Sequence, residues 1–251
     1  MAVVLITGAS SGIGLACANL FKIRGDKVYG ANRTPDVRSD ASVSATVADI
    51  LSREGRIDIL VNNAGIAIAG SVEDTSIEQA KEQFEVNFFG VLRVCRAVLP
   101  AMRQQGTGYI VNMGSIAGQV AVPYQGLYSA SKFALEGLTE SLRMETRHFG
   151  IKVVLIEPGD HRTNLTANRR KATPSPPYAE RFNRAIGQME KDERNGPYPV
   201  GIAKLVERIV SNPDPRLRYT IGPLAERAAI WLKRLGPAAL VEKTMNSYYK
   251  C

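Results

Sequence analysis

The chain has 251 residues, of which 45% are hydrophobic, and a formal net charge of +8. This length is enough to bury a substantial core, and no repeat or long linker divides the chain, so we expect one domain over residues 1–251. Three scattered cysteines argue against a disulfide framework. The first residues show no secretory-signal pattern, and no apolar segment could span a membrane. Together these features predict a cytoplasmic protein. With two histidines and no clustered thiols, a catalytic metal would lack ligands, so none is expected.

The first element is a buried strand that leads into a glycine-rich turn. Residues 3–6 are Val-Val-Leu-Ile, and helically spaced apolar residues follow the turn TGASSGIG at residues 7–14. Gly8, Gly12 and Gly14 would let the backbone approach a pyrophosphate at the start of that helix, where free N–H groups and the helix dipole favour an anion. The alternative, a merely flexible loop, is disfavoured because strand and helix lie on the correct sides. The turn therefore predicts dinucleotide binding.

Further strands and helices then alternate along the chain. Thr75 and Glu78 predict a capping box for the second long helix. Alternation of this kind predicts a doubly wound parallel α/β sheet with ligands at the carboxyl ends of its strands. The expected strands cover residues 27–31, 57–62, 109–113, 152–157 and 218–221, and the expected helices cover 43–53, 77–104, 128–149 and 201–211.

Tyr128 and Lys132 carry the clearest chemical signal in the chain. They are four residues apart on an expected helix, so they share one face of it. An ammonium beside a phenol stabilises the phenolate, so we expect Lys132 to lower the pKa of Tyr128 and make it a usable proton donor and acceptor. The spacing alone is common on exposed helices; other motifs in order, including Ser115 upstream, make a catalytic role the better interpretation.

In these motifs the chain resembles the classical short-chain dehydrogenase/reductase family. The pattern is closest to the branch that contains hydroxysteroid and retinol dehydrogenases. The matching segments run in order along nearly all of the chain: TGASSGIG, NNAG at residues 62–65, Asn87 in VNFFG, Ser115, YSASK at residues 128–132 and PGDHRT at residues 158–163.

The resemblance implies a role for each matching residue. Tyr128 would exchange a proton with the substrate, Lys132 would also bind the nicotinamide ribose, Ser115 would hold the carbonyl oxygen, and Asn87 would bend its helix and hold a water linking Lys132 to solvent. His161 and Arg162 could meet substrate, solvent or cofactor phosphate. The residues that the resemblance places around the cofactor are Gly8, Ser10, Ser11, Gly12, Ile13, Gly14, Asp36, Val37, Asn63, Ala64, Gly65, Tyr128, Lys132, Pro158, Gly159 and Thr163.

The end of the second strand bears on the choice of cofactor. An NAD enzyme usually has a carboxylate there, but this chain has Asn32 followed by Arg33, whose guanidinium can bind a 2′-phosphate. The sequence therefore favours NADP over NAD, the alternative being a solvated surface arginine. Only Thr34 and Pro35 then precede Asp36, too few residues for a crossover to another strand. Either the usual edge strand and its helix are lost, or a segment is missing from the chain.

The remaining segments concern the substrate and partners. Residues 164–199 resemble the family's substrate-covering segment, with a possible helix over 178–190. We expect a small carbonyl or alcohol substrate, a dimer or tetramer through residues 77–104 and 128–149, and no nucleic-acid partner. An idle dinucleotide-binding protein remains an alternative. So does a membrane-surface protein that uses the basic, apolar tail at residues 225–250, although packing of that tail on a subunit is preferred.

Overall fold

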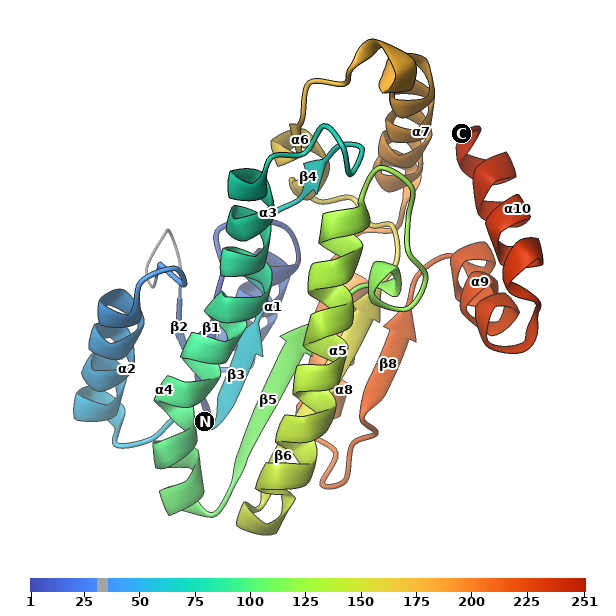
Figure 1. The fold of residues 1–251 in the computed structure, drawn as a ribbon. Helices are drawn as coiled ribbons and strands as arrows, with labels where there is room; N and C mark the ends of the chain where they lie inside the picture. Colours follow the sequence, from blue (N-terminus) through green and yellow to red (C-terminus); the bar gives the residue numbers. More distant parts are fainter. Residues whose placement is uncertain (31–35) are drawn as a thin grey trace.

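A six-stranded sheet forms the centre of the computed structural model, which describes residues 1–30 and 36–251. Its strands are β1 (Val3–Ile6), β2 (Lys27–Tyr29), β3 (Ile59–Asn62), β5 (Gly108–Met113), β6 (Ile151–Pro158) and β8 (Arg218–Ile221). The order β2-β1-β3-β5-β6-β8 runs outward in both directions from β1 and β3, and every neighbouring pair is parallel (Figure 1). This confirms the predicted doubly wound α/β fold, with strand limits within two residues of those expected where both are described.

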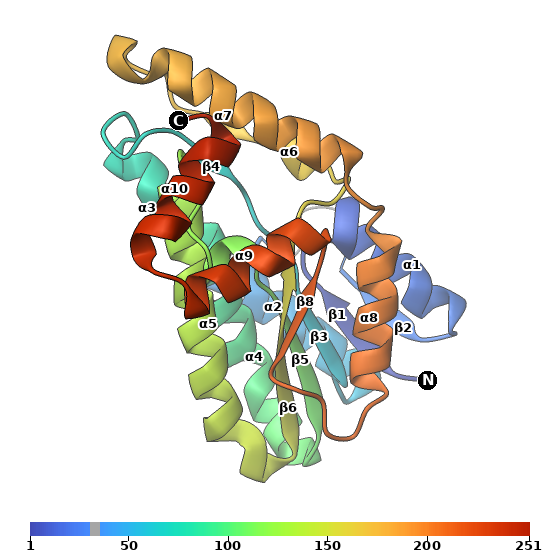
Figure 2. The ribbon, with the colours of Figure 1, turned by 90° about the vertical axis from the view of Figure 1, so that its right-hand side faces the viewer.

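Helices cover both faces of the sheet (Figure 2). One layer consists of α1 (Gly12–Ile23) and α8 (Val200–Val210), and the other of α2 (Asp40–Glu54), α4 (Gly90–Gln105) and α5 (Gly126–Thr146). The central strands are apolar on both sides because each face is buried; β1 and β3, for example, have no exposed residue. Two hydrophobic clusters result, one under each helical layer.

The helix expected over residues 77–104 is divided into three parts. The first is α3 (Ile77–Phe84), the second a π-helical segment (Glu85–Phe89) that contains Asn87, and the third is α4. The irregularity expected at Asn87 is therefore present. The predicted capping box is wrong by one position: Ser76 and Gln79 form it, because the Thr75 hydroxyl donates instead to the carbonyl of Ser71 at 2.7 Å.

The edge of the sheet agrees with the short link noticed in the sequence. Among the described residues no strand lies outside β2, so the sheet has six strands and lacks a further edge strand there. Ser39 caps α2 by accepting a hydrogen bond from the backbone of Ser42. Residues 31–35, where the link lies, are outside the described part of the chain.

A second group of elements lies over the carboxyl end of the sheet (Figures 1 and 2). It consists of a small parallel pair, β4 (Ile68–Ala69) with β7 (Arg170–Lys171), and the helices α6 (Leu165–Asn168), α7 (Pro176–Asn195), α9 (Leu224–Leu235) and α10 (Ala238–Tyr249). The helix expected over 178–190 is thus confirmed and longer. We call residues 160–199 together with 222–251 the cover. Across residues 1–30 and 36–251, none of the helices has both the length and the apolar content to cross a membrane.

Candidate active site

The glycine turn joins the carboxyl end of β1 to the start of α1. Gly8 and Gly12 have φ angles of 66° and 54°, a region that favours glycine. A Cβ on Gly14 would stand 2.3 Å from the carbonyl oxygen of Gly8, so only glycine lets the helix pack this close to the turn. Ser11 is the N-cap residue of α1, but its side chain forms no capping hydrogen bond. The first N–H groups of the helix can therefore donate to a bound anion instead. The residues present fit a dinucleotide pyrophosphate at this position.

The end of β3 is bound tightly to the same turn. The Asn63 amide donates to the carbonyls of Thr7 and Gly8 at 3.1 and 3.0 Å, and the Thr7 hydroxyl accepts from the backbone of Asn63 and Ala64 at 3.0 Å each. Asn63, Ala64 and Gly65 all face the cavity described below. These bonds give the two strand ends one fixed geometry.

Asp36 and Val37 border the same side of the cavity. The Asp36 carboxylate is paired with Arg38, which donates from Nε at 3.0 Å and from Nη2 at 2.9 Å, and this pairing lowers the pKa of Asp36. Arg38 itself lines the cavity, a cation that the sequence interpretation did not single out. The predicted cofactor residues Asn32 and Arg33 lie outside the described residues.

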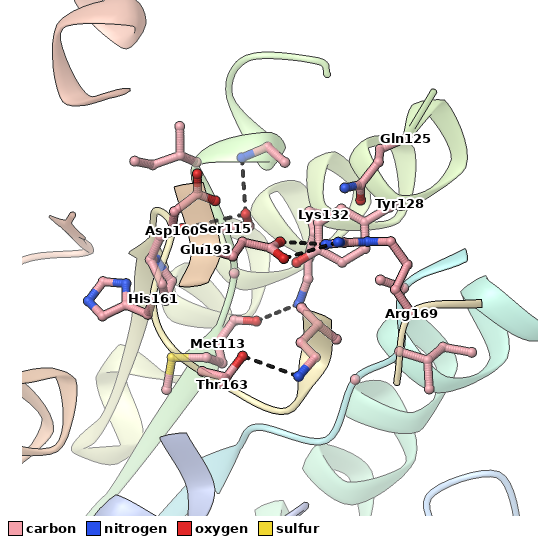
Figure 3. A pocket seen from close by; sticks show the side chains of 18 of the residues that line it. Met113, Ser115, Gln125, Tyr128, Lys132, Asp160, His161, Thr163, Arg169 and Glu193 are labelled. Carbon is pink, nitrogen blue, oxygen red and sulfur yellow. Dashed lines mark hydrogen bonds and ion pairs between the residues drawn. The ribbon is translucent and has the colours of Figure 1, made fainter. Parts of the chain in front are cut away.

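Tyr128 and Lys132 lie on the first turns of α5 and face the cavity together with Ser115, which follows β5 (Figure 3). The Lys132 ammonium donates to the carbonyl of Met113 at 2.8 Å and stands 5.7 Å from the centre of the Tyr128 ring. The Ser115 hydroxyl accepts from the backbone of Ala117 at 3.1 Å, which orients it. Three residues that are up to 17 positions apart in the sequence thus meet at one strand end.

The pKa expected for Tyr128 is corrected by the structure. Burial raises the pKa of Tyr128 to about 12, and the hydrogen bond with Ser115 opposes part of that rise. The Lys132 ammonium is directed to the Met113 carbonyl at 2.8 Å, and burial lowers the pKa of Lys132 itself to about 8. The phenol therefore keeps its proton at neutral pH in this arrangement.

Asn87 lies behind this group rather than in the cavity wall. Its side chain is 1% exposed; the amide nitrogen donates to the Ile66 carbonyl at 3.0 Å and to the Ser131 hydroxyl at 3.2 Å, while its oxygen accepts from the Ile66 backbone at 2.9 Å. Asn87 thereby ties the π-helical segment to the loop after β3 and to α5. Asn87 is therefore a positioning residue, which fixes the loop after β3 and the start of α5 relative to each other.

One cavity of about 960 Å³ collects most of the predicted residues. This volume is at the upper end of ordinary ligand sites. Gly14 and Asn87 are the two described members of the predicted set that do not line it. Those that do are Gly8, Ser10, Ser11, Gly12, Ile13, Asp36, Val37, Asn63, Ala64, Gly65, Ser115, Tyr128, Lys132, Pro158, Gly159 and Thr163.

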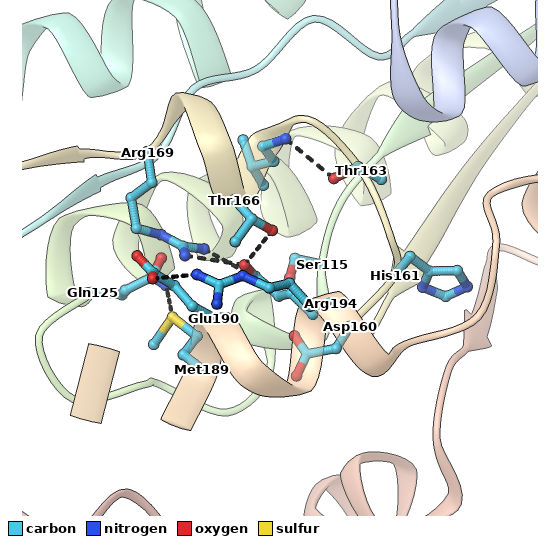
Figure 4. A network of polar contacts seen from close by, with 12 residues as sticks. Ser115, Gln125, Asp160, His161, Thr163, Thr166, Arg169, Met189, Glu190 and Arg194 are labelled. Atoms are coloured by element: carbon cyan, nitrogen blue, oxygen red, sulfur yellow. Dashed lines mark hydrogen bonds and ion pairs between the residues drawn. The ribbon is translucent and has the colours of Figure 1, made fainter. Parts of the chain in front are cut away.

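A buried ion pair in the cover forms part of the cavity wall and was missed by the sequence interpretation. Arg169, whose side chain is 1% exposed, donates to both carboxylate oxygens of Glu193 on α7, one of them at 3.0 Å (Figure 3). Figure 4 shows Arg169 and Thr166 in the same network. Thr166 donates to the same carboxylate at 2.6 Å. The partners are 24 residues apart, and no local pattern signals such a pair.

Two further carboxyl groups close the same wall. The backbone N–H of Asp160 donates to Glu226 at the start of α9 at 2.9 Å. Burial, together with the charge of Glu226, raises the pKa of Asp160 to about 8, and burial also raises the pKa of Glu226. Next to them His161 lines the cavity and bonds the Gly159 carbonyl at 2.9 Å, whereas Arg162 does not line the cavity and stacks on Tyr198.

Comparison with known proteins agrees with this geometry. A family profile described as short chain dehydrogenase matches residues 31–174, more than half of the chain. The chain is 39% identical to a 3-ketodihydrosphingosine reductase of Bacteroides thetaiotaomicron, over 98% of this chain and 97% of that protein. It is 31% identical to dehydrogenase/reductase SDR family member 7B of Danio rerio, over 94% and 82% of the two chains.

Solved structures give the same result. A short-chain dehydrogenase from Streptomyces avermitilis superposes with a TM-score of 0.82 at 33% identity, covering 100% of this chain and 98% of that one. A short chain dehydrogenase/reductase from Burkholderia phymatum, solved in complex with NAD, gives 0.78 at 25% identity and covers 93% of each chain. The fold is one that binds nicotinamide dinucleotides. The chain therefore belongs to the short-chain dehydrogenase family, as its motifs predicted.

Proposed function

We propose that the protein is an NADP(H)-dependent oxidoreductase that interconverts a lipophilic ketone or aldehyde and the corresponding alcohol. The observation that carries the proposal is the convergence of Ser115, Tyr128 and Lys132 on one cavity at the carboxyl end of the sheet. The intact set argues against the alternative of an idle dinucleotide-binding protein.

Each residue has a defined task in the proposed reaction. The glycine turn and the segment from Pro158 to Thr163 would hold the dinucleotide, and the chemistry that it would supply when bound is a hydride for the carbonyl carbon. Tyr128 donates the proton of its hydroxyl to the carbonyl oxygen, and Ser115 stabilises the charge that develops on that oxygen. Lys132 would bind ribose hydroxyls with its ammonium. A phenol pKa of about 12 keeps the proton on Tyr128 at neutral pH, which suits the reductive direction.

The substrate class follows from the cavity wall together with the relative of 39% identity. Ile116, Val120 and Met245 supply apolar surface, and Asp160 and Glu226 supply carboxyl groups. An alkyl chain would pack on the first set, and an amino head group would form hydrogen bonds with the second, in which burial keeps a proton on Asp160 at neutral pH. We therefore infer a long-chain ketone with an amino head group, the chemical class of 3-ketodihydrosphingosine.

The test is NADPH oxidation against matched carbonyl compounds. The panel contains a long-chain 2-amino ketone, the same chain without the amine, a steroid ketone and retinaldehyde. We expect turnover with the long chains and a lower KM for the amino ketone. If the protein binds NADPH yet reduces no carbonyl compound, it is the idle dinucleotide-binding protein.

Cofactor preference rests on Arg33. Arg33→Ala should weaken NADPH binding about tenfold to a hundredfold and leave NADH nearly unchanged, because a charge-assisted hydrogen bond contributes roughly 1.5 to 3 kcal/mol. Arg53→Ala is the matched control, since Arg53 is exposed on α2 and, among the described residues, forms its ion pair with Asp49. Equal losses of both cofactors in Arg33→Ala would contradict NADP selectivity.

A further inference from the structure

The outward face of α9 presents an apolar stripe to solvent. Leu224, Trp231 and Leu235 are 78%, 61% and 81% exposed. At 100° per residue they fall within a sector about 40° wide, with Ala228 beside them. Isolated exposed apolar residues are ordinary, but large ones aligned along one helix face are not. Figure 1 shows α9 and α10 at the margin of the molecule beyond β8.

The stripe has a basic border. Arg227 and Arg234 are exposed and lie together on one flank, 40° or more from the apolar sector. The Arg234 guanidinium stands 5.7 Å from the centre of the Trp231 ring. The one acidic residue of α9, Glu226, is on the opposite face, where it bonds Asp160 and lines the cavity. Trp and Leu bordered by Arg are the composition of a helix that lies on a lipid surface.

A second copy of the chain fits this stripe less well. A helix of 12 residues is about 18 Å long, so a stripe one side chain wide covers on the order of 200 Å². A standard interface buries about 800 Å² on each partner. Two such faces would also bring their arginines together. Docking on an anionic bilayer does not require a minimum interface area of this kind, and the negative charge of the lipids complements Arg227 and Arg234.

We propose that the outer face of α9 docks on an anionic lipid surface, with Trp231 and Leu235 entering the headgroup region and Arg227 near the lipid phosphates. The sequence alone favoured packing of this tail on a subunit. The new observation is that the apolar side chains of α9 divide into an inner set at the cavity and an outer set in solvent. Docking would hold the cavity next to the bilayer, and it is independent of the proposed substrate.

The experiment uses the fluorescence of Trp231, which is the only tryptophan in the chain. Full-length protein is titrated with vesicles of phosphatidylcholine alone or mixed three to one with phosphatidylglycerol. We expect a shift of emission to shorter wavelength and quenching by bromine-labelled acyl chains with the anionic vesicles only. No shift with anionic vesicles would overturn the proposal, as would a shift that depends on protein concentration without lipid, which indicates a second copy.

Variants locate the contact. Leu235→Ser should weaken partition into anionic vesicles roughly tenfold, and Arg227→Gln about fivefold. The matched controls are Ile23→Ser, at a residue 87% exposed on α1, and Arg147→Gln after α5; both should partition as the wild type does. Equal loss in the controls would contradict docking through α9. Vesicle binding requires no turnover, so its result stands apart from that of the carbonyl panel.

Discussion

The floor and the cover of the cavity are built in different ways. The floor consists of the strand ends and adjoining helix starts from Gly8 to Pro158, where side chains are fixed by backbone hydrogen bonds and two apolar clusters. The cover is attached to the rest through two small apolar clusters, one between α7 and Ala69 and one between α9 and Ile116, and through separate polar contacts such as Arg170 with Glu82. A rigid floor suits residues that must meet reacting atoms, whereas a cover with fewer contacts can open for substrate.

The largest expected effect comes from disturbing the floor. Gly14→Ala should lower the free energy of unfolding by about 3 kcal/mol or more, because its Cβ would meet the Gly8 carbonyl oxygen at 2.3 Å and backbone would have to move. Urea unfolding measures this loss. The matched change in the cover is Gly187→Ala on α7, where no atom lies within 4 Å; it should raise helix stability by about 0.5–1 kcal/mol. Equal effects of the two changes would remove the distinction between floor and cover.

Breaking the buried ion pair should loosen the cover alone. Arg169→Met leaves the Glu193 carboxylate without a cation beside it and with only Thr166 as its described hydrogen-bond donor, so it should make local opening of α7 easier by about 3 kcal/mol, measured by amide hydrogen exchange. Exchange in β1 and β5 should stay as in the wild type. The double variant Arg169→Met, Glu193→Met should recover most of the protection. Increased exchange throughout the sheet would mean that the pair supports the whole fold.

A separate effect is the dependence of the free energy of unfolding on pH. The pKa of Asp160 rises from 3.8 to about 8 on folding, so the folded protein keeps a proton that the unfolded chain releases. Through this group the free energy of unfolding falls as the pH rises from about 4 to about 8, and levels off above that. Asp160→Asn should therefore be more stable relative to the wild type at pH 8 than at pH 4, by urea unfolding at each pH. Asp49→Asn, exposed on α2, should show no such difference. If the difference in free energy of unfolding between Asp160→Asn and the wild type is the same at pH 4 and pH 8, the raised pKa of Asp160 is contradicted.

The smallest expected effect is a change in the dissociation constant of an oligomer. We propose a dimer or tetramer through α5 and through α4 with the π-helical segment before it, where Phe133 and Phe89 are 38% and 43% exposed. Phe89→Ser should raise the dissociation constant roughly tenfold, as expected for losing part of one apolar contact. Sedimentation provides the measurement. A wild-type protein that is monomeric at micromolar concentration would refute the proposal.

The floor could be predicted from sequence because its signals are local. Apolar strands, the glycine turn and the Tyr128–Lys132 spacing each lie within a few residues, and the parallel topology brings them to one edge. The helix of the cover could be predicted but its polar contacts could not, since Glu226 and Arg169 reach the cavity through contacts between distant segments. The pKa of Tyr128 also required the structure: spacing puts Lys132 on the same helix face but does not show that its ammonium is directed to Met113.

The central claim is that Tyr128 supplies the proton, and the most direct measurement compares turnover and NADPH affinity in Tyr128→Phe. This change removes only the transferable proton, so the account predicts a loss of turnover of ~10²-fold or more with nearly unchanged NADPH affinity. Lys132→Met, in contrast, should lower both quantities. Retention of more than about a tenth of the wild-type rate by Tyr128→Phe would contradict the claim.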